Sequence, residues 1–163
     1  MKNLKASIMY FINLVFGVLM YVFLSQSYIS ISFLDNTRPL TNGYEIIANY
    51  FEGNGTEVMM ALSNLIVAIL AGVIILTSIY SLLVCFGAVK KSKAFGLVNF
   101  VSIIVSIALA VFAGISLFCT VGHLDGMSTE GNGFVIGWAV IVNFVIAVIA
   151  IVTSILATKF SKK

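Results

Sequence analysis

Four long apolar runs dominate the pattern of this sequence. They cover residues 8–28, 58–87, 95–119 and 134–157. None contains Asp, Glu, Lys, Arg or His, and each reaches the roughly 20 residues that a helix needs to cross the hydrocarbon core of a bilayer. The runs are continuous, whereas the strands of a transmembrane barrel alternate, so a barrel is excluded. We therefore predict an all-α integral membrane fold, a four-helix transmembrane bundle that forms one domain over residues 1–163.

The composition agrees with a lipid-embedded chain. Of the 163 residues, 61% are hydrophobic and 9% are charged, whereas a soluble domain carries about a quarter charged residues. A chain this apolar would have no water-compatible surface if it folded in solution. Lysine outnumbers arginine, and Asn, Ile and Phe are abundant, which is typical of an AT-rich bacterial genome. We therefore expect the protein in a bacterial cytoplasmic membrane.

The charged residues fall on opposite sides of the predicted membrane. The lysines precede the first run, separate the second from the third, or follow the fourth: Lys2, Lys5, Lys90, Lys91, Lys93, Lys159, Lys162 and Lys163. The acidic residues lie in the other two segments, together with Arg38 and His123: Asp35, Glu45, Glu52, Glu57, Asp125 and Glu130. The positive-inside rule assigns the lysine side to the cytoplasm. We therefore predict that both termini are cytoplasmic.

The first apolar run allows a second interpretation, a secretory signal peptide. Lys2 and Lys5 form a basic segment before the run, and Ser25-Gln26-Ser27 resembles a small-residue cleavage site. The run is longer than the 7–15 apolar residues that are usual in a signal peptide, so we favour a transmembrane helix.

The first outer segment, residues 29–57, has a pattern of its own. Apolar residues alternate with serines over 29–33, which predicts a strand, and turn-forming residues follow over 35–39. Asn42 and Glu45 have the spacing of a capping box, and an apolar helical face follows them. We predict a small extracytoplasmic cap with a strand, a turn and an amphipathic helix on the membrane surface. The alternative is a loosely ordered loop.

The second outer segment, residues 120–133, contains four glycines and is predicted to be a flexible loop. His123 and Asp125 lie close together in it and could contribute to a metal site. Two polar residues in a glycine-rich loop are common and a site would need further ligands, so we expect no bound metal.

Each apolar run contains one asparagine: Asn13, Asn64, Asn99 and Asn143. An asparagine in lipid needs a hydrogen-bond partner, and a bond between helices is worth about 0.6–2 kcal/mol. We favour the interpretation that these residues hold helices together. The alternative is a polar pore lining, which would usually show more polar residues on one helix face. Asn13 and Asn99 each lie eight residues after a lysine, hence at similar depth, and we expect them to pair.

Small residues recur every four positions along the third run: Ser102, Ser106, Ala110 and Gly114. This small-residue ladder allows a neighbouring helix to approach closely, and that helix belongs either to this chain or to a second copy. Leu109, beside the ladder, is expected to face lipid. Tyr10, Tyr28 and Trp138 suit an aromatic belt at the membrane interface.

Several classes of membrane protein and enzyme require residues that this chain lacks. Ion-coupled transporters, proton relays and voltage sensors depend on ionisable residues inside the membrane, and the four runs contain none. The chain has no phosphate-binding glycine loop and no HExxH motif. Cys85 and Cys119 lie near opposite ends of their runs, too far apart for the Cα separation of about 5.5 Å in a disulfide. We therefore expect no enzyme activity, no cofactor and no nucleic-acid partner.

The layout of four spans with a larger first outer segment resembles that of claudin-like proteins. In that family the segment carries a Gly-Leu-Trp motif and a pair of cysteines, whereas residues 29–57 contain neither Trp nor Cys. The resemblance is one of layout alone.

Together, these features predict a non-enzymatic membrane protein that acts through protein–protein contacts. An accessory subunit, a structural component and an immunity-type protein all fit this description. Its expected surroundings are the lipid bilayer and either copies of itself or another membrane protein. The alternative is an oligomeric channel or pore, in which small-residue faces pack several copies around a conduit.

Overall fold

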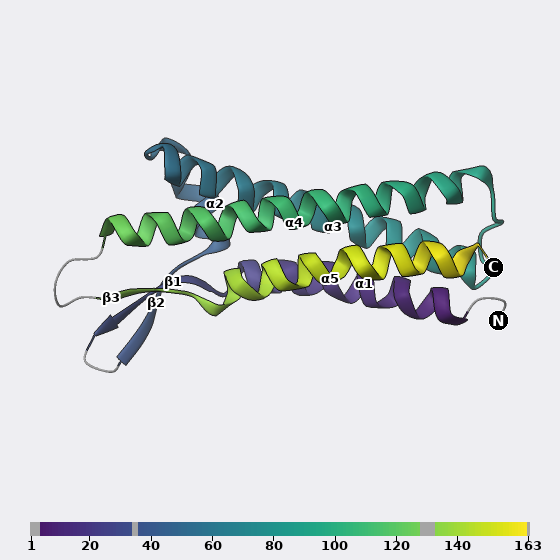
Figure 1. Ribbon diagram of the computed structural model, residues 1–163, viewed down its shortest axis with the longest axis horizontal. Coiled ribbons are helices and arrows are strands. Elements are labelled where there is room, and N and C mark those ends of the chain that lie inside the picture. The colour runs from purple at the N-terminus through teal and green to yellow at the C-terminus, as the bar shows by residue number, and fades with distance from the viewer. Residues whose placement is uncertain (1–3, 34–35, 128–132, 163) are drawn as a thin grey trace.

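In a computed structural model that describes residues 4–33, 36–127 and 133–162, four long helices form a bundle with a small sheet at one end (Figure 1). The long helices are α1 (Leu4–Leu24), α3 (Gly55–Cys85), α4 (Lys93–Met127) and α5 (Trp138–Ser161). All four are long and apolar enough to cross a membrane, which confirms that the four apolar runs form long helices. Three helices lie within about four residues of the predicted bounds, whereas α4 continues well past residue 119.

The shorter elements lie at one end of the bundle (Figure 1). They are β1 (Ser27–Phe33), β2 (Asn36–Asn42), α2 (Gly43–Asn49), the 3-10 turn η1 (Tyr50–Glu52) and β3 (Gly133–Ile136). We call this the sheet end. At the other end α1 begins, the loop over residues 86–92 joins α3 to α4, and α5 ends. We call it the lysine end, because all the lysines of the described residues lie there.

The four long helices pack as a closed square, in which α1 and α4 each contact both α3 and α5. Met20, Ile74 and Leu109 are among the buried residues at its centre. Gly17 brings α1 close to α3, since a Cβ added there would lie 2.7 Å from Ile75 Cγ1 and 3.2 Å from a backbone oxygen. A small residue at this crossing therefore allows the close backbone approach that holds helices together in lipid.

The helices α3 and α4 are much longer than α1 and α5. They contain 31 and 35 residues, about 46 and 52 Å at 1.5 Å per residue, whereas a hydrocarbon core is about 30 Å thick. Their extra turns project at the sheet end (Figure 1). There α3 packs against α2 and η1, and α4 packs against β3, so that the sheet end is one structure with the bundle.

The sheet has three strands in the order β2-β1-β3, and both pairs are antiparallel. The predicted strand over 29–33 is confirmed as part of β1, with Ile29 opposite Ile136 of β3. The predicted turn is wrong for residues 36–39, which lie in β2 with Pro39 opposite Ser30, while residues 34–35 lie outside the described residues. Pro39 is tolerated because β2 is an edge strand. The sheet thus adds β-structure to the predicted all-α bundle.

The predicted capping box begins α2. Asn42 Oδ1 accepts hydrogen bonds from the backbone N–H groups of Tyr44 and Glu45, both at 3.0 Å, and Glu45 Oε2 accepts one from the Asn42 N–H at 3.1 Å. A second capping box, which the sequence interpretation missed, joins Asn54 and Glu57 at the start of α3. Each box satisfies backbone donors that a helix start leaves unpaired.

The prediction of a flexible loop over 120–133 is wrong for most of that segment. Residues 120–127 continue α4, Gly133 begins β3, and residues 128–132 lie outside the described residues. Gly122 does not interrupt the helix, because Leu124 two residues later is buried among residues of α3, β1 and α5. Tertiary packing therefore outweighs the low helix propensity of glycine here.

Candidate functional site

The four intramembrane asparagines are buried, and each side chain is hydrogen-bonded to a side chain from another element of the same chain. The four are Asn13 on α1, Asn64 on α3, Asn99 on α4 and Asn143 on α5. Together with their serine, threonine and tyrosine partners they form a polar interior that runs along the bundle. We treat this polar interior as the candidate functional site.

At the lysine end, Asn99 joins three helices. Tyr10 Oη on α1 donates to Asn99 Oδ1 at 2.7 Å, and Asn99 Nδ2 donates to Ser161 Oγ on α5 at 3.2 Å. Tyr10 is buried, so its predicted position in an interfacial belt is wrong. The phenol points inward because the buried amide of Asn99 needs a donor, and burying either group alone would be costly.

In the middle of the bundle, Asn13 contacts α5 instead of Asn99. Its Nδ2 donates to Ser154 Oγ at 3.0 Å, and its Oδ1 accepts a hydrogen bond from Thr153 Oγ1. The expected pairing of Asn13 with Asn99 is therefore wrong. The two asparagines lie at different depths, since their partners Ser154 and Ser161 are seven residues apart on α5. The square packing also sets α1 and α4 on opposite corners.

At the sheet end, the remaining two asparagines line one small void. Asn64 Oδ1 accepts from Ser116 Oγ at 2.8 Å, and Asn143 Nδ2 donates to Tyr28 Oη at 2.7 Å. Asn64 Nδ2 and Asn143 Oδ1, a donor and an acceptor, have no hydrogen-bond partner among the described residues. Tyr28 is buried, so its predicted belt position is also wrong, whereas Trp138 is half-exposed.

The small-residue ladder of α4 faces α5 of the same chain. The hydroxyls of Ser106 and Ser154 lie 2.8 Å apart, and those of Ser102 and Ser154 lie 3.5 Å apart. Ala110 belongs to the buried core, and a Cβ added at Gly114 would lie 3.2 Å from a ring carbon of Phe144 on α5. The ladder is thus used for close packing inside one chain.

Leu109, next to the ladder, is fully buried, so the expectation that it faces lipid is wrong. It packs in the same core cluster as Met20, Val67 and Ala147. Because α4 contacts two neighbouring helices, its buried face is wider than the row of small residues. Lipid-facing side chains are also apolar, so no polar residues in the sequence show where the buried face ends.

At the sheet end, His123 is buried beside α3. Its Nδ1 lies 3.8 Å from Glu57 Oε1, and its ring lies 5.7 Å from the ring of Tyr50. Burial raises the pKa of the Tyr50 hydroxyl, and the charges of Glu57 and Glu45 raise it further. Among the described residues no three His, Cys, Asp or Glu side chains are grouped closely enough to hold a metal ion. Asp125 is exposed near the end of α4.

The polar interior is made of neutral amides and hydroxyls. Such groups can donate and accept hydrogen bonds, but they do not change charge near neutral pH. The arrangement is therefore suited to fixing helices at defined positions. No known protein family, curated protein or solved structure matches this chain.

Proposed function

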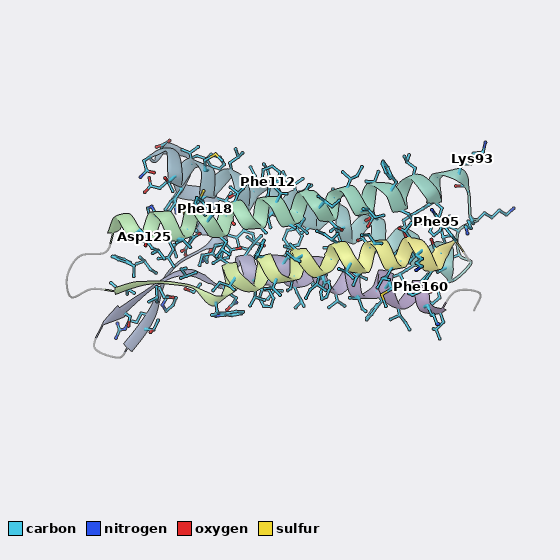
Figure 2. All side chains as sticks on the ribbon, viewed as in Figure 1. Lys93, Phe95, Phe112, Phe118, Asp125 and Phe160 are labelled. Carbon is cyan, nitrogen blue, oxygen red and sulfur yellow. The ribbon has the colours of Figure 1, made fainter. Side chains whose placement is uncertain are left out.

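We propose that this chain is a non-enzymatic membrane protein that acts through protein–protein contacts, as an accessory subunit, a structural component or an immunity-type protein. We further infer that both termini lie in the cytoplasm of a bacterial cell, with the sheet end as an extracytoplasmic cap. The distribution of charge supports this orientation: Lys93 and Asp125 stand near opposite ends of α4 (Figure 2). Lysine-rich segments are retained on the cytoplasmic side.

One observation carries the proposal: the buried asparagines of the spans and the small-residue ladder of α4 make their contacts within the chain. All four asparagines bond to other elements of the same chain, and the ladder packs against α5. An oligomeric channel would need such residues on the outside of the bundle, where several copies could surround a conduit. Internal hydrogen bonds instead produce a fixed scaffold, whose outer surface is left for contacts with partners.

Two outer surfaces remain for such contacts. The flanks of the bundle are apolar, and Phe118, 79% exposed, projects from α4 (Figure 2). At the sheet end, the edge strand β2 presents Arg38 and Leu40, both exposed, and α2 presents Tyr44. The flank suits lipid or another membrane helix, whereas the mixed polar and apolar sheet end suits a water-exposed partner.

The proposal is tested by oligomeric state and conductance measured on the same sample. A photocrosslinking amino acid replaces Leu40 or Phe118, and the cells are irradiated. The protein is then purified in nanodiscs. We expect a fixed stoichiometric complex, with itself or with one other membrane protein, and no ion conductance in planar bilayers. A closed ring of several copies that conducts ions would contradict the proposal and support the channel.

A further inference from the structure

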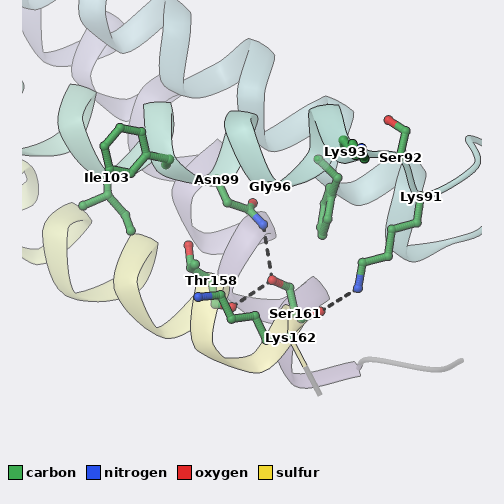
Figure 3. A pocket seen from close by; sticks show the side chains of 11 residues that line it. Lys91, Ser92, Lys93, Gly96, Asn99, Ile103, Thr158, Ser161 and Lys162 are labelled. Atoms are coloured by element: carbon green, nitrogen blue, oxygen red, sulfur yellow. Dashed lines mark hydrogen bonds between the residues drawn. The ribbon is translucent and has the colours of Figure 1, made fainter.

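A groove opens between α4 and α5 at the lysine end, where it borders the polar interior (Figure 3). Its volume is about 570 Å³, and its lining comes from the α3–α4 loop, the first turns of α4 and the last turns of α5. Asn99 and Ser161 lie at its inner side and are bonded to each other. The groove has the volume of a typical small-molecule binding site.

The mouth of the groove is positively charged. Lys91, Lys93 and Lys162 line it, and its lining contains no acidic residue. Lys91 is held in place, since its Nζ donates to the Ser161 carbonyl at 3.0 Å and lies 5.5 Å from the centre of the Phe95 ring. An ammonium carries three donors, so Lys91 has two left for an anionic ligand. The mouth thus fits a group with negative charge and several oxygens.

The groove becomes apolar with distance from the lysines. Gly96, Phe100 and Ile103 follow one face of α4 at spacings of four and three residues. A Cβ added at Gly96 would meet no atom within 4 Å, and Phe100 is 60% exposed, so this face is open. Ile103 lies ten residues beyond Lys93, about 15 Å along the helix, which is about half the thickness of a hydrocarbon core. This apolar track, from Gly96 to Ile103, therefore reaches about as deep as one leaflet of the bilayer.

We propose that this groove binds one anionic phospholipid from the leaflet at the lysine end. The phosphate lies among the three lysines, and an acyl chain follows the track from Gly96 to Ile103. A zwitterionic lipid would bring a cation to a mouth that has no carboxylate to receive it, so the site selects net negative headgroups. Basic pockets between transmembrane helices are known to recognise anionic lipids. The inference goes beyond the proposed function and holds for either orientation of the chain.

The binding is measured by native mass spectrometry of the full chain, released from detergent after titration with phosphatidylglycerol or phosphatidylcholine of the same acyl composition. We expect one phosphatidylglycerol to bind at least about ten-fold more tightly than phosphatidylcholine. Equal binding of the two lipids would overturn the proposal. Addition of glycerol phosphate separates lipid from soluble anion: it should leave the bound lipid in place, and displacement at millimolar concentration would overturn the lipid as occupant.

Charge is tested with matched sets of lysines from the same end. Replacing Lys91, Lys93 and Lys162 by Gln should weaken phosphatidylglycerol binding by about five-fold for each lysine, since a lysine near the surface contributes about 1 kcal/mol. The control set Lys5→Gln, Lys90→Gln and Lys159→Gln changes the net charge equally but leaves the groove intact. It should alter binding by less than about three-fold. Equal losses in both sets would mean general attraction to a basic surface and would overturn the site.

Shape is tested without any change of charge. Gly96→Leu fills the open track and should abolish the bound phosphatidylglycerol, whereas Gly122→Leu, also in open space but at the sheet end, should leave it unchanged. Melting temperatures in the same detergent show whether each variant is folded. The double variant Lys93→Gln/Lys162→Gln keeps the Lys91 contact with Ser161 and serves if the triple variant unfolds. Full binding by a folded Gly96→Leu variant would overturn the placement in the groove.

Discussion

Asn13 and Ser154 lie side by side in the middle of the bundle, with the Asn13 amide nitrogen donating to the Ser154 hydroxyl oxygen at 3.0 Å. The same hydroxyl lies 2.8 Å from that of Ser106, so one serine of α5 connects α1 with α4. These two helices occupy opposite corners of the square and make no extensive direct contact. The polar contact through α5 therefore adds to the direct bond between Tyr10 and Asn99 in linking these two corners of the bundle.

The asparagines should differ in their contribution to stability. Both amide groups of Asn13 are hydrogen-bonded, whereas Asn64 has one bond and an unpaired Nδ2 beside a void. We expect Asn13→Leu to lower the free energy of unfolding by about 1–2 kcal/mol, because two interhelical bonds are lost. Asn64→Leu should cost less, about 0.5–1 kcal/mol, because only the bond from Ser116 is lost and an unsatisfied buried donor is removed with it. Unfolding in mixed micelles measures both, and a larger loss at Asn64 would contradict this assignment of bonds.

The core position of Leu109 predicts a large effect of truncation. Leu109→Ala should destabilise the protein by about 2–5 kcal/mol, as do other substitutions that leave a cavity in a packed core. The matched control is Val111→Ala on the same helix, where the side chain is 53% exposed. Lipid replaces the lost contacts there, so we expect a change of less than about 0.5 kcal/mol. Thermal unfolding in one detergent compares the two, and similar effects would place Leu109 on the lipid-facing surface.

Gly137 fixes the approach of α5 to the sheet. Its N–H donates to the Tyr28 carbonyl at 2.7 Å, and an added Cβ would lie 2.0 Å from the backbone oxygen of Ser27. Gly137→Ala must therefore push β1 away and should destabilise the protein by about 1–3 kcal/mol. Gly122→Ala has open space and should be neutral or stabilise α4 by up to about 1 kcal/mol. Melting temperatures test the contrast, and a stable Gly137→Ala variant would show that the junction is looser than described.

The proposed orientation predicts which positions a membrane-impermeant thiol reagent can reach in intact cells. With Cys85 and Cys119 replaced by Ser, a single cysteine at Asn42 should be labelled readily. Single cysteines at Lys91 and at Lys162 should be labelled only after the cells are permeabilised. Lys91 and Lys162 are exposed, whereas Asn42, the last residue of β2, is half-buried, so labelling at Asn42 alone cannot be explained by better access to solvent within the protein. Labelling at position 91 without permeabilisation would reverse the orientation.

The sequence by itself determined the features that depend on neighbouring residues. A helix spans a membrane because about 20 consecutive residues are apolar, so the four spans could be identified without any partner. The capping box of Asn42 and Glu45 joins residues three positions apart and was predicted for the same reason. The alternation over 29–33 likewise identified β1.

Only the tertiary structure decided which residues meet across the bundle. Lipid tails are as apolar as leucine, so a lipid-facing side chain such as Val111 and a core side chain such as Leu109 look alike in sequence. The pairing of β1 with β3 joins residues more than 100 positions apart, and four residues of β3 carry too little pattern to predict a strand. The asparagines could be recognised as buried polar groups, but their partners follow from the rotation of each helix, and that rotation is set by packing against neighbouring helices.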